Sequence, residues 1–318
     1  MNSPLIEHEA IVPPELSLRR LDHAAAALFP QYSRSRLQQW IEEGKLTVDG
    51  KVLKAKTKVS LGAKIEICAS PDSTHHEPEE IALNIVFEDE SIAVLNKPLG
   101  LVVHPGAGNQ TGTLLNALLH HFPSLESVPR AGIVHRLDKN TTGLMVVAKT
   151  LESQNQLVKQ LQSRKVKRIY EAIVYGKVPL TGKVDAPIGR HPQTRVKMSV
   201  QPNGKEAITR YSPLSVFKSH THLELSLETG RTHQIRVHMR HIGHSLVGDP
   251  AYGGTFKIPA DSPDEQLVNC LRNFPRQALH ARCLSFEHPQ SQDIVEFEVV
   301  LPADMTDLLS LLERNESG

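Results

Sequence analysis

The chain has 318 residues, of which 39% are hydrophobic and 22% are charged, a composition typical of globular proteins. At about 150 residues per domain, this length favours two domains. No apolar run approaches the roughly 20 residues of a membrane-spanning helix, and the first ten residues lack the basic and apolar regions of a signal peptide. We therefore expect a cytoplasmic protein. The cysteines Cys68, Cys270 and Cys283 form no CxxC pair, so neither disulfides nor a cysteine zinc site is expected.

The net charge of +1 hides an uneven distribution of charge along the chain. The basic residues of segment 17–67 are Arg19, Arg20, Arg34, Arg36, Lys45, Lys51, Lys54, Lys56, Lys58 and Lys64. Half as many acidic residues accompany them, whereas residues 72–90 are acidic and contain no Lys or Arg. A basic module is the electrostatic pattern of a nucleic-acid-binding surface. The alternative is a basic surface that only contacts solvent.

Two helices and a small sheet are predicted in this first module. Apolar residues with helical spacing between Ser17 and Phe29 predict one helix, which Pro30 ends. A second helix is predicted from an N-cap at Ser33 to Gly44. The turn pair at 49–50, Asp-Gly, predicts a hairpin with a type I′ turn. Strands are predicted at residues 46–48, 51–53 and 63–67.

A polar segment with two prolines, residues 70–78, is predicted to be a linker to a larger domain. In that domain, strands are predicted at residues 85–87, 92–95, 144–148, 170–175 and 222–227, and helices at 112–121, 152–163 and 232–242. The helices are too few for a doubly wound parallel sheet. We therefore predict an α+β fold with a mixed, mainly antiparallel sheet and flanking helices. The predicted domains are residues 16–76 and 81–318.

The densest polar cluster is Gly132–Leu144, a charged loop between two apolar stretches, where catalytic groups are often found. Within it, His-Arg-Leu-Asp-Lys-Asn-Thr-Thr-Gly at 135–143 resembles the signature of the RluA and RluD type of pseudouridine synthases. Further motifs that resemble this family lie, in the same order, at residues 96–105, 168–172, 228–238, 248–253 and 276–280. Residues 32–36 and 48–51 resemble the S4 RNA-binding domain, which precedes the catalytic domain in the RluD branch.

The resemblance implies a set of catalytic residues. Asp138 falls on the aspartate that the family uses for catalysis. Arg231, placed just before the helix predicted at 232–242, is expected to pair with Asp138, and its charge would keep that carboxylate ionised. Tyr170 is expected to line the pocket, where its ring would stack on the base and its hydroxyl would help to remove the C5 proton. Without the resemblance, Tyr170 reads equally well as a core aromatic residue.

Substrate-binding roles are implied for His135, Arg136 and Leu246. Arg136 resembles the arginine that displaces or replaces the flipped base, and Leu246 would form an apolar wall under the uracil. A plain core leucine is nearly as good an interpretation of Leu246. In the first module, the predicted RNA-binding residues are Arg19, Arg34, Arg36, Lys45 and Lys51.

The histidines at 233, 238, 241 and 244 could suggest a metal site, but no neighbouring carboxylate or cysteine completes a ligand set. They are predicted to be helix-surface residues. We expect no metal, no cofactor and no membrane association, and a monomer.

The expected activity is isomerisation of uridine to pseudouridine in 23S ribosomal RNA, in the stem-loop that contacts the small subunit, with support of ribosome assembly. Two alternatives stay open: a tRNA-modifying member of the same family, and a non-catalytic RNA-binding assembly factor. The residues also leave open whether Asp138 forms a covalent adduct or acts through a glycal.

Overall fold

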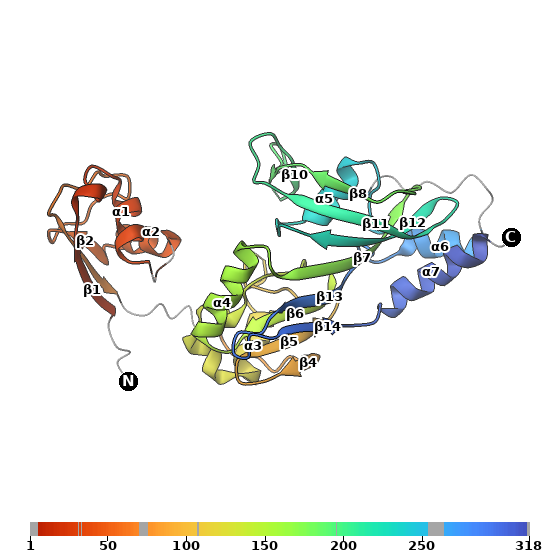
Figure 1. Cartoon of the computed structure of the whole chain (residues 1–318), viewed down its shortest axis with the longest axis horizontal. Coiled ribbons are helices and arrows are strands. Elements are labelled where there is room, and N and C mark those ends of the chain that lie inside the picture. Colours follow the sequence, from red (N-terminus) through yellow and green to blue (C-terminus); the bar gives the residue numbers. More distant parts are fainter. Residues whose placement is uncertain are drawn as a thin grey trace. The chain divides into compact units, whose positions relative to one another are not determined.

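The computed structural model describes residues 6–30, 32, 34–69, 76–106, 108–194, 196–253 and 264–316. The chain divides into two compact units, Met1–His75 and His76–Gly318, which Figure 1 draws. The predicted N-cap at Ser33 and most of the predicted linker, residues 70–75, lie outside the described residues. No helix in the described ranges is both long enough and apolar enough to cross a bilayer.

The first unit packs two helices, α1 (Leu21–Leu28) and α2 (Arg34–Glu42), on a three-stranded antiparallel sheet. Its strands, in the order β1-β3-β2, are β1 (Ile6–Ile11), β2 (Leu46–Val48) and β3 (Lys64–Ala69). The 3-10 helix Pro14–Leu16 follows β1. Trp40 of α2 is fully buried in the core of this unit, and its packing holds the short helix against the sheet.

The predicted type I′ turn is confirmed, because Asp49 and Gly50 both have positive φ, 48° and 73°. The strand predicted at 51–53 does not form. Lys51 forms a single bridge to Val48, Val52 is 60% exposed, and Leu53 alone of these three residues packs against the core. β2 pairs with β3 instead, and the opposite edge of β3 is taken by β1, which sequence reasoning missed.

The second unit contains a nine-stranded sheet with the order β4-β5-β6-β13-β7-β12-β11-β8, with β14 paired to β13. The strands are β4 (Ile85–Glu88), β5 (Ile92–Lys97), β6 (Thr142–Ala148), β7 (Lys167–Tyr175), β8 (Gly182–Asp185), β11 (Ile208–Val216), β12 (His220–Leu227), β13 (Leu279–Glu287) and β14 (Ile294–Glu298). A separate pair is formed by β9 (Ile188–Arg190) and β10 (Met198–Val200). Every pairing is antiparallel except that of β13 with β6, so the predicted mixed, mainly antiparallel sheet is confirmed.

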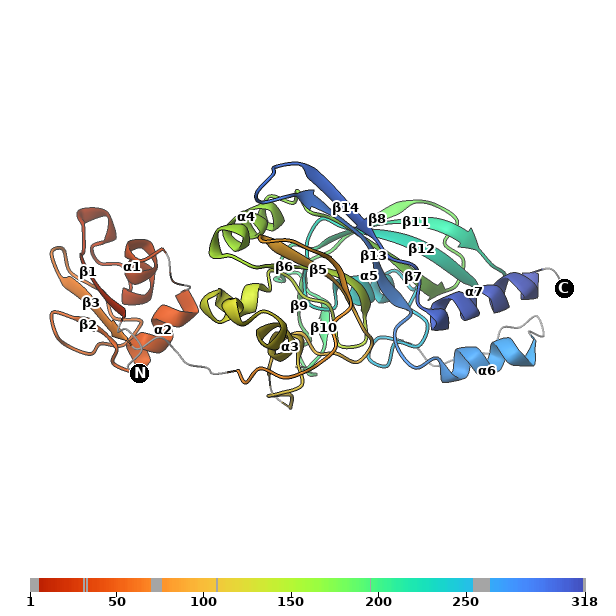
Figure 2. The same ribbon diagram turned by 90° about the horizontal axis from the view of Figure 1, so that it is seen from below.

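Helices flank this sheet, as expected for an α+β fold (Figure 2). They are α3 (Leu114–His121), α4 (Leu151–Gln162), α5 (Gln234–His241), α6 (Glu265–Asn273) and α7 (Ala303–Glu316), and the 3-10 helices are Pro123–Ser127 and Pro129–Gly132. The predicted helices at 112–121, 152–163 and 232–242 correspond to α3, α4 and α5. Figures 1 and 2 both place α6 and α7 side by side near the C-terminal end.

β5 and β6 are buried on both faces, which gives a rigid mount for the loops at their ends. Leu95 and Met145 face a cluster that includes α3, whereas Val94 and Val146 face a second cluster that includes Leu157 of α4. Alternate residues of each strand therefore supply two separate cores, as the two-residue period of a strand requires.

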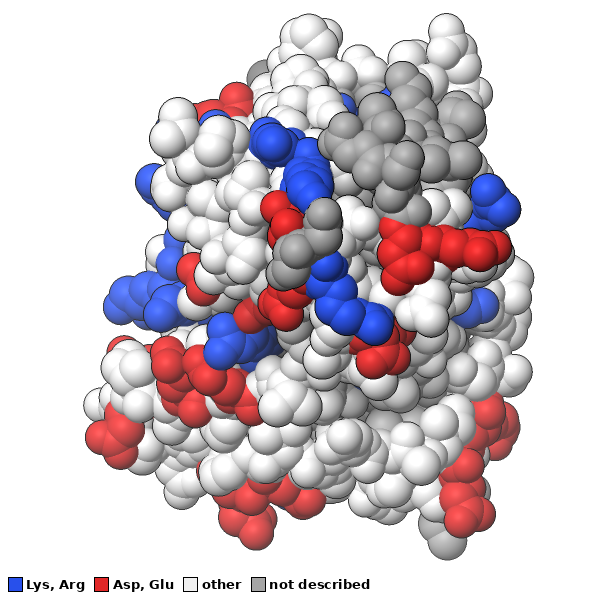
Figure 3. Space-filling model, turned by 90° about the vertical axis from the view of Figure 1, so that its right-hand side faces the viewer, with Lys and Arg blue, Asp and Glu red and all other residues white. Residues whose placement is uncertain are grey.

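Charge on the outer surface is mixed where α6 and α7 lie. On the face in Figure 3, Lys and Arg side chains lie among Asp and Glu side chains. Interspersed charge of both signs is typical of a surface that contacts solvent. The described part of this face therefore gives no electrostatic sign of a nucleic-acid interface.

Candidate active site

The loop that carries Asp138 runs from the 3-10 helix Pro129–Gly132 into the start of β6. Its path depends on Gly132, whose φ is +73° and where a Cβ would lie 1.8 Å from the carbonyl oxygen of Ala148. Only glycine fits this position. The loop closes with a hydrogen bond from the backbone N–H of Thr141 to the carbonyl of Asp138, 3.0 Å long.

Lys97, at the end of β5, holds this loop in place through hydrogen bonds. Its buried ammonium donates to the carbonyl oxygens of Pro98, Leu101 and Lys139 at 2.7 to 3.0 Å. Burial lowers the pKa of Lys97 to about 8, although the charge of Asp138 acts to raise it. These hydrogen bonds connect the loop after β5 to the loop that carries Asp138, so the two loops are held together beside the site.

Asp138 is paired with Arg236 of α5. The Nη1 of Arg236 donates to Oδ2 of Asp138 at 2.8 Å, and Nε2 of His233 lies 3.8 Å from the other carboxylate oxygen. Arg236 also forms a bidentate pair with buried Asp249, at 2.7 and 2.9 Å. The two acidic partners raise the pKa of Arg236 above its usual value, although burial acts to lower it. The guanidinium is therefore charged and bridges two carboxylates.

The predicted pair between Arg231 and Asp138 is wrong. Arg231 lies before the first turn of α5, and its Nε donates to the carbonyl oxygen of Glu206 at 2.9 Å. Arg236, in the first turn of the helix, takes the expected place. Arg236 was not among the predicted site residues, although it lies in the same motif, residues 228–238, as Arg231. α5 is enclosed on several sides, and an enclosed arginine needs an acidic partner.

A cavity of about 240 Å³ opens beside the Asp138 carboxylate. It is lined by Val102, Val103, Arg136, Leu137, Asp138, Lys139, Asn140, His233, Arg236, Pro250 and Gln277. Cationic and neutral polar groups outnumber the acidic one, and the wall also contains apolar side chains. Such a lining suits a nucleotide: the polar and apolar groups can contact a planar base, and the cationic groups can contact the anionic sugar–phosphate chain.

Among the other predicted site residues, Arg136 lines the cavity and is exposed. Tyr170 and Leu246 lie in one buried apolar cluster next to it and do not line the cavity. Burial raises the pKa of Tyr170, with opposing effects from the charges of Arg168 and Asp138, so its hydroxyl is neutral at physiological pH. His135 does not line the cavity either, because its Nε2 accepts a hydrogen bond from the backbone N–H of Val146 in β6.

The histidines of the α5 region are not all at the surface. His238 is fully buried, and its ring nitrogens contact Thr209 Oγ1 and the carbonyl of Ala186, both at 2.9 Å. The prediction of a surface residue is therefore wrong for His238. His233 is one of the lining residues of the cavity and was not predicted as a site residue.

The predicted RNA-binding residues of the first unit fall into two groups. Arg34 pairs with buried Asp22 at 2.7 Å, the guanidinium of Arg36 lies 5.3 Å from the ring centre of Trp40, and Lys45 pairs with Glu43 at 2.7 Å. Arg19 and Lys51 are exposed, and no ion pair involves either of them within the described ranges. Since no acidic side chain in the described part of the chain pairs with these two cations, both are free to contact phosphate.

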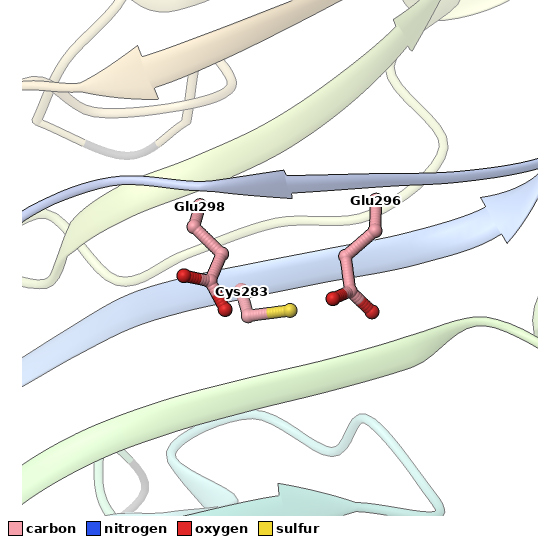
Figure 4. A group of neighbouring side chains, drawn as sticks. All are labelled: Cys283, Glu296 and Glu298. Atoms are coloured by element: carbon pink, nitrogen blue, oxygen red, sulfur yellow. The ribbon is translucent and has the colours of Figure 1, made fainter.

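Cys283, Glu296 and Glu298 form the one described group of three side chains that could together hold a metal ion (Figure 4). Burial and the two glutamates raise the pKa of the Cys283 thiol, which keeps it protonated. Each carboxylate also has a cation nearby, Lys167 at 3.9 Å and Arg282 at 3.7 Å. Because the two carboxylates are exposed and each already has a basic side chain nearby, the cluster needs no cation to balance its charge.

Two family models match the chain: "RNA pseudouridylate synthase" over residues 91–241 and "S4 domain" over residues 19–65. Ribosomal large subunit pseudouridine synthase D of Pseudomonas aeruginosa is 56% identical over 317 residues, 99% of both chains. The chain belongs to the RluA and RluD type of RNA pseudouridine synthases. The enzyme of the same name from Escherichia coli is 52% identical over 93% of this chain and 91% of its own.

Solved structures of more distant relatives agree with this RNA pseudouridine synthase fold. Human RNA Pseudouridylate Synthase Domain Containing 4 matches with a TM-score of 0.57 and 27% identity, over 72% of this chain and 93% of its own. The matched range 91–241 contains Asp138, Tyr170 and Arg236, but it ends before the loop that carries Asp249. The enzyme class predicted from the sequence is thereby confirmed.

Proposed function

We propose that this synthase isomerises uridines in large-subunit ribosomal RNA, in the stem-loop that contacts the small subunit, and that Asp138 is its catalytic carboxylate. The observation that carries the proposal is the Asp138–Arg236 ion pair at the cavity, in a chain whose near full-length relatives are named as large-subunit synthases. A substrate of this kind implies a place in the cytoplasm and a contribution to ribosome assembly.

The reaction breaks the N1–C1′ glycosidic bond of a uridine and forms a C5–C1′ bond, with loss of the C5 proton. The ionised carboxylate of Asp138 is suited to either opening step. It can attack C1′ and displace the uracil, or it can remove the C2′ proton to give a glycal. Arg236 supports both routes because it holds the carboxylate oriented toward the cavity at 2.8 Å.

The uridine must leave its stack to reach Asp138, at a cost of a few kcal/mol. Arg136 lines the cavity and is exposed, so it is placed to occupy or stabilise the gap that the base leaves. Tyr170 and Leu246 lie in the cluster behind the lining and would contact the base if the cavity opens toward them. In that position the Tyr170 hydroxyl would help in the removal of the C5 proton.

The substrate assignment can be tested by mapping pseudouridine in total RNA from a strain that lacks this chain. We expect loss of modification at a small set of uridines in one stem-loop of the large-subunit RNA, restored by the wild-type chain. Loss confined to transfer RNA would instead assign the chain to the tRNA-modifying members. Unchanged modification everywhere would contradict the proposed function.

The first unit is proposed to supply RNA affinity through Arg19 and Lys51, with Arg34, Arg36 and Lys45 as further contacts. Replacing both Arg19 and Lys51 by glutamine should weaken binding and lower the magnitude of the slope of log affinity against log salt by about 0.7 to 0.9 per lost phosphate contact. Turnover at saturating RNA should not change. Equilibrium binding over a range of salt concentrations measures the slope.

Lys64→Gln is the matched control, because Lys64 belongs to the same unit but already pairs with Glu9 and Glu66 at 2.8 and 2.9 Å. Its removal should leave the slope near that of the wild type. Equal slopes for the double variant and the wild-type protein would remove Arg19 and Lys51 from the RNA contacts.

A further inference from the structure

The loop from Gly248 to Gly253, which follows α5, surrounds the Arg236 guanidinium. Asp249 pairs with it through both carboxylate oxygens, and the Tyr252 ring lies over it, 5.0 Å from the guanidinium carbon to the ring centre. Glycine is required at both ends of the loop. A Cβ at Gly248 would lie 2.1 Å from the carbonyl of Arg276, and one at Gly253 would lie 2.3 Å from that of Asp249.

Asp249 is held more firmly than Asp138. Its side chain is fully buried, and Oδ1 accepts the backbone N–H groups of Ala251 and Tyr252 at 2.9 Å in addition to Nη2 of Arg236. Burial acts to raise the pKa of Asp249, but Arg236 and these backbone hydrogen bonds lower it below its usual value. The carboxylate is therefore a fixed negative charge whose orientation the loop determines.

Tyr252 orients the second group that faces Asp138. Its hydroxyl oxygen accepts the backbone N–H of Met198 at 2.8 Å and lies 2.7 Å from Nδ1 of His233. Donation of the hydroxyl hydrogen to Nδ1 leaves the ring proton on Nε2, the atom 3.8 Å from Asp138. His233 is held in the left-handed region, at φ 57°, so the start of α5 brings the ring to the cavity at a cost in backbone strain.

A fixed counter-charge matters because the charge of Asp138 does not persist through the reaction. Whether the carboxylate bonds to the sugar or takes up a proton, it loses its negative charge next to a buried guanidinium. Without a second carboxylate, Arg236 would then be an unpaired buried cation, which is strongly unfavourable. Asp249 stays ionised and keeps Arg236 in place while Asp138 reacts.

We propose that Asp249 and Tyr252 are positioning residues of this active site: Asp249 holds Arg236, and Tyr252 holds His233, against the reacting carboxylate of Asp138. The inference rests on the proposed role of Asp138 and adds to it a function for the loop Gly248–Gly253. Neither residue lines the cavity, so neither is a catalytic residue itself.

Single-turnover rates and RNA dissociation constants of full-length variants test this inference. Asp249→Asn should lower the rate at saturating RNA on the order of 10²-fold, because a misplaced guanidinium no longer orients Asp138. Tyr252→Phe, which keeps the ring over Arg236, should lower it roughly tenfold, in the range that supporting hydrogen bonds typically contribute. RNA affinity should stay near that of the wild type in both variants. Asp249→Glu should recover part of the lost rate.

Asp304→Asn is the matched control. Asp304 forms the same bidentate pair with buried Arg276, at 2.6 and 2.7 Å, and does not line the cavity. It should also lower thermal stability, but leave the rate unchanged. Equal rate losses in Asp249→Asn and Asp304→Asn would mean that Asp249 has only a structural role. A wild-type rate in folded Asp249→Asn and Tyr252→Phe would overturn the inference. If the wild-type chain itself forms no pseudouridine, the proposed function fails instead.

Discussion

Replacing Asp138 by asparagine is expected to reduce pseudouridine formation to background while RNA binding is retained. The amide has nearly the shape of the carboxylate but neither attacks C1′ nor removes a proton, so the loss should exceed the roughly 10²–10⁴-fold that a single acid–base group contributes. Among the residues that the structure describes, no other acidic side chain lines the cavity, so none of them is placed to substitute for Asp138. Single-turnover assays on large-subunit RNA fragments measure the loss.

The fold should survive this change, because Arg236 keeps its bidentate pair with Asp249 when Asp138 loses its charge. A thermal unfolding midpoint close to that of the wild-type protein is therefore the control. Removal of one negative charge beside a polyanion should leave affinity equal or slightly tighter. Pseudouridine formed by a pure preparation of the variant would show that another group carries the chemistry.

The central strands could be predicted from the sequence because their pattern is strong. The apolar runs in β5 and β6 have no alternative to burial, and each lies within a short distance of turn residues. The helices α3, α4 and α5 were also predicted, with ends displaced by a few residues. β13, which joins the two halves of the sheet, was missed although its first five residues alternate apolar and polar side chains; the alternation shifts by one residue at Cys283 and Leu284, which weakens the pattern.

α7 was missed although a signal was present. Met305, Leu308 and Leu312 lie at helical spacing and are buried against α6 and β7, but no motif drew attention to this stretch. The edge strand β1 left a weaker signal, since four of its six residues are exposed. Edge strands of this kind are fixed by pairing with their neighbour, here β3, which a single-sequence pattern does not reveal.

For the site, motif order placed Asp138 correctly in a loop before a buried strand, and it placed Arg136 at the cavity. Of the two arginines in the motif at residues 228–238, it selected Arg231, whereas Arg236 is the partner of Asp138. The correct arginine depends on where α5 begins. The side-chain oxygen of Gln234 accepts hydrogen bonds from the backbone N–H of Arg231 and from the hydroxyl of Thr229. These hydrogen bonds fix the start of the helix beyond Arg231. Arg236 then faces Asp138 and Asp249. Because these ion pairs join separate segments of the chain, local sequence patterns do not predict them.

The difference between these two arginines leads to the second large expected effect. Arg236→Gln should lower the free energy of unfolding by about 3–5 kcal/mol, because it leaves Asp249 as a buried charge without its cation. It should also remove most of the turnover, since Asp138 loses the guanidinium that donates a hydrogen bond to it. Arg231→Gln should change stability by about 0.5 kcal/mol or less and leave turnover at saturating RNA near the wild-type value, as its side chain has one backbone contact.

The pH dependence of stability separates a charge effect from simple loss of packing. In the wild-type protein the pKa of Asp249 is lowered on folding, so its pairing stabilises the fold above the ordinary aspartate pKa, about 3.9, and this stabilisation is lost as the pH falls through the lower folded value. The deficit of Arg236→Gln should therefore be largest at neutral pH and shrink as the pH falls to about 4 and below, because Asp249, buried without its cation, takes up a proton more readily than an exposed aspartate does. Denaturant unfolding at several pH values measures this deficit. A loss of unfolding free energy that does not change with pH would mean that Arg236 stabilises the fold through packing alone. A greater loss of turnover in Arg231→Gln than in Arg236→Gln would return the role of Asp138 partner to Arg231.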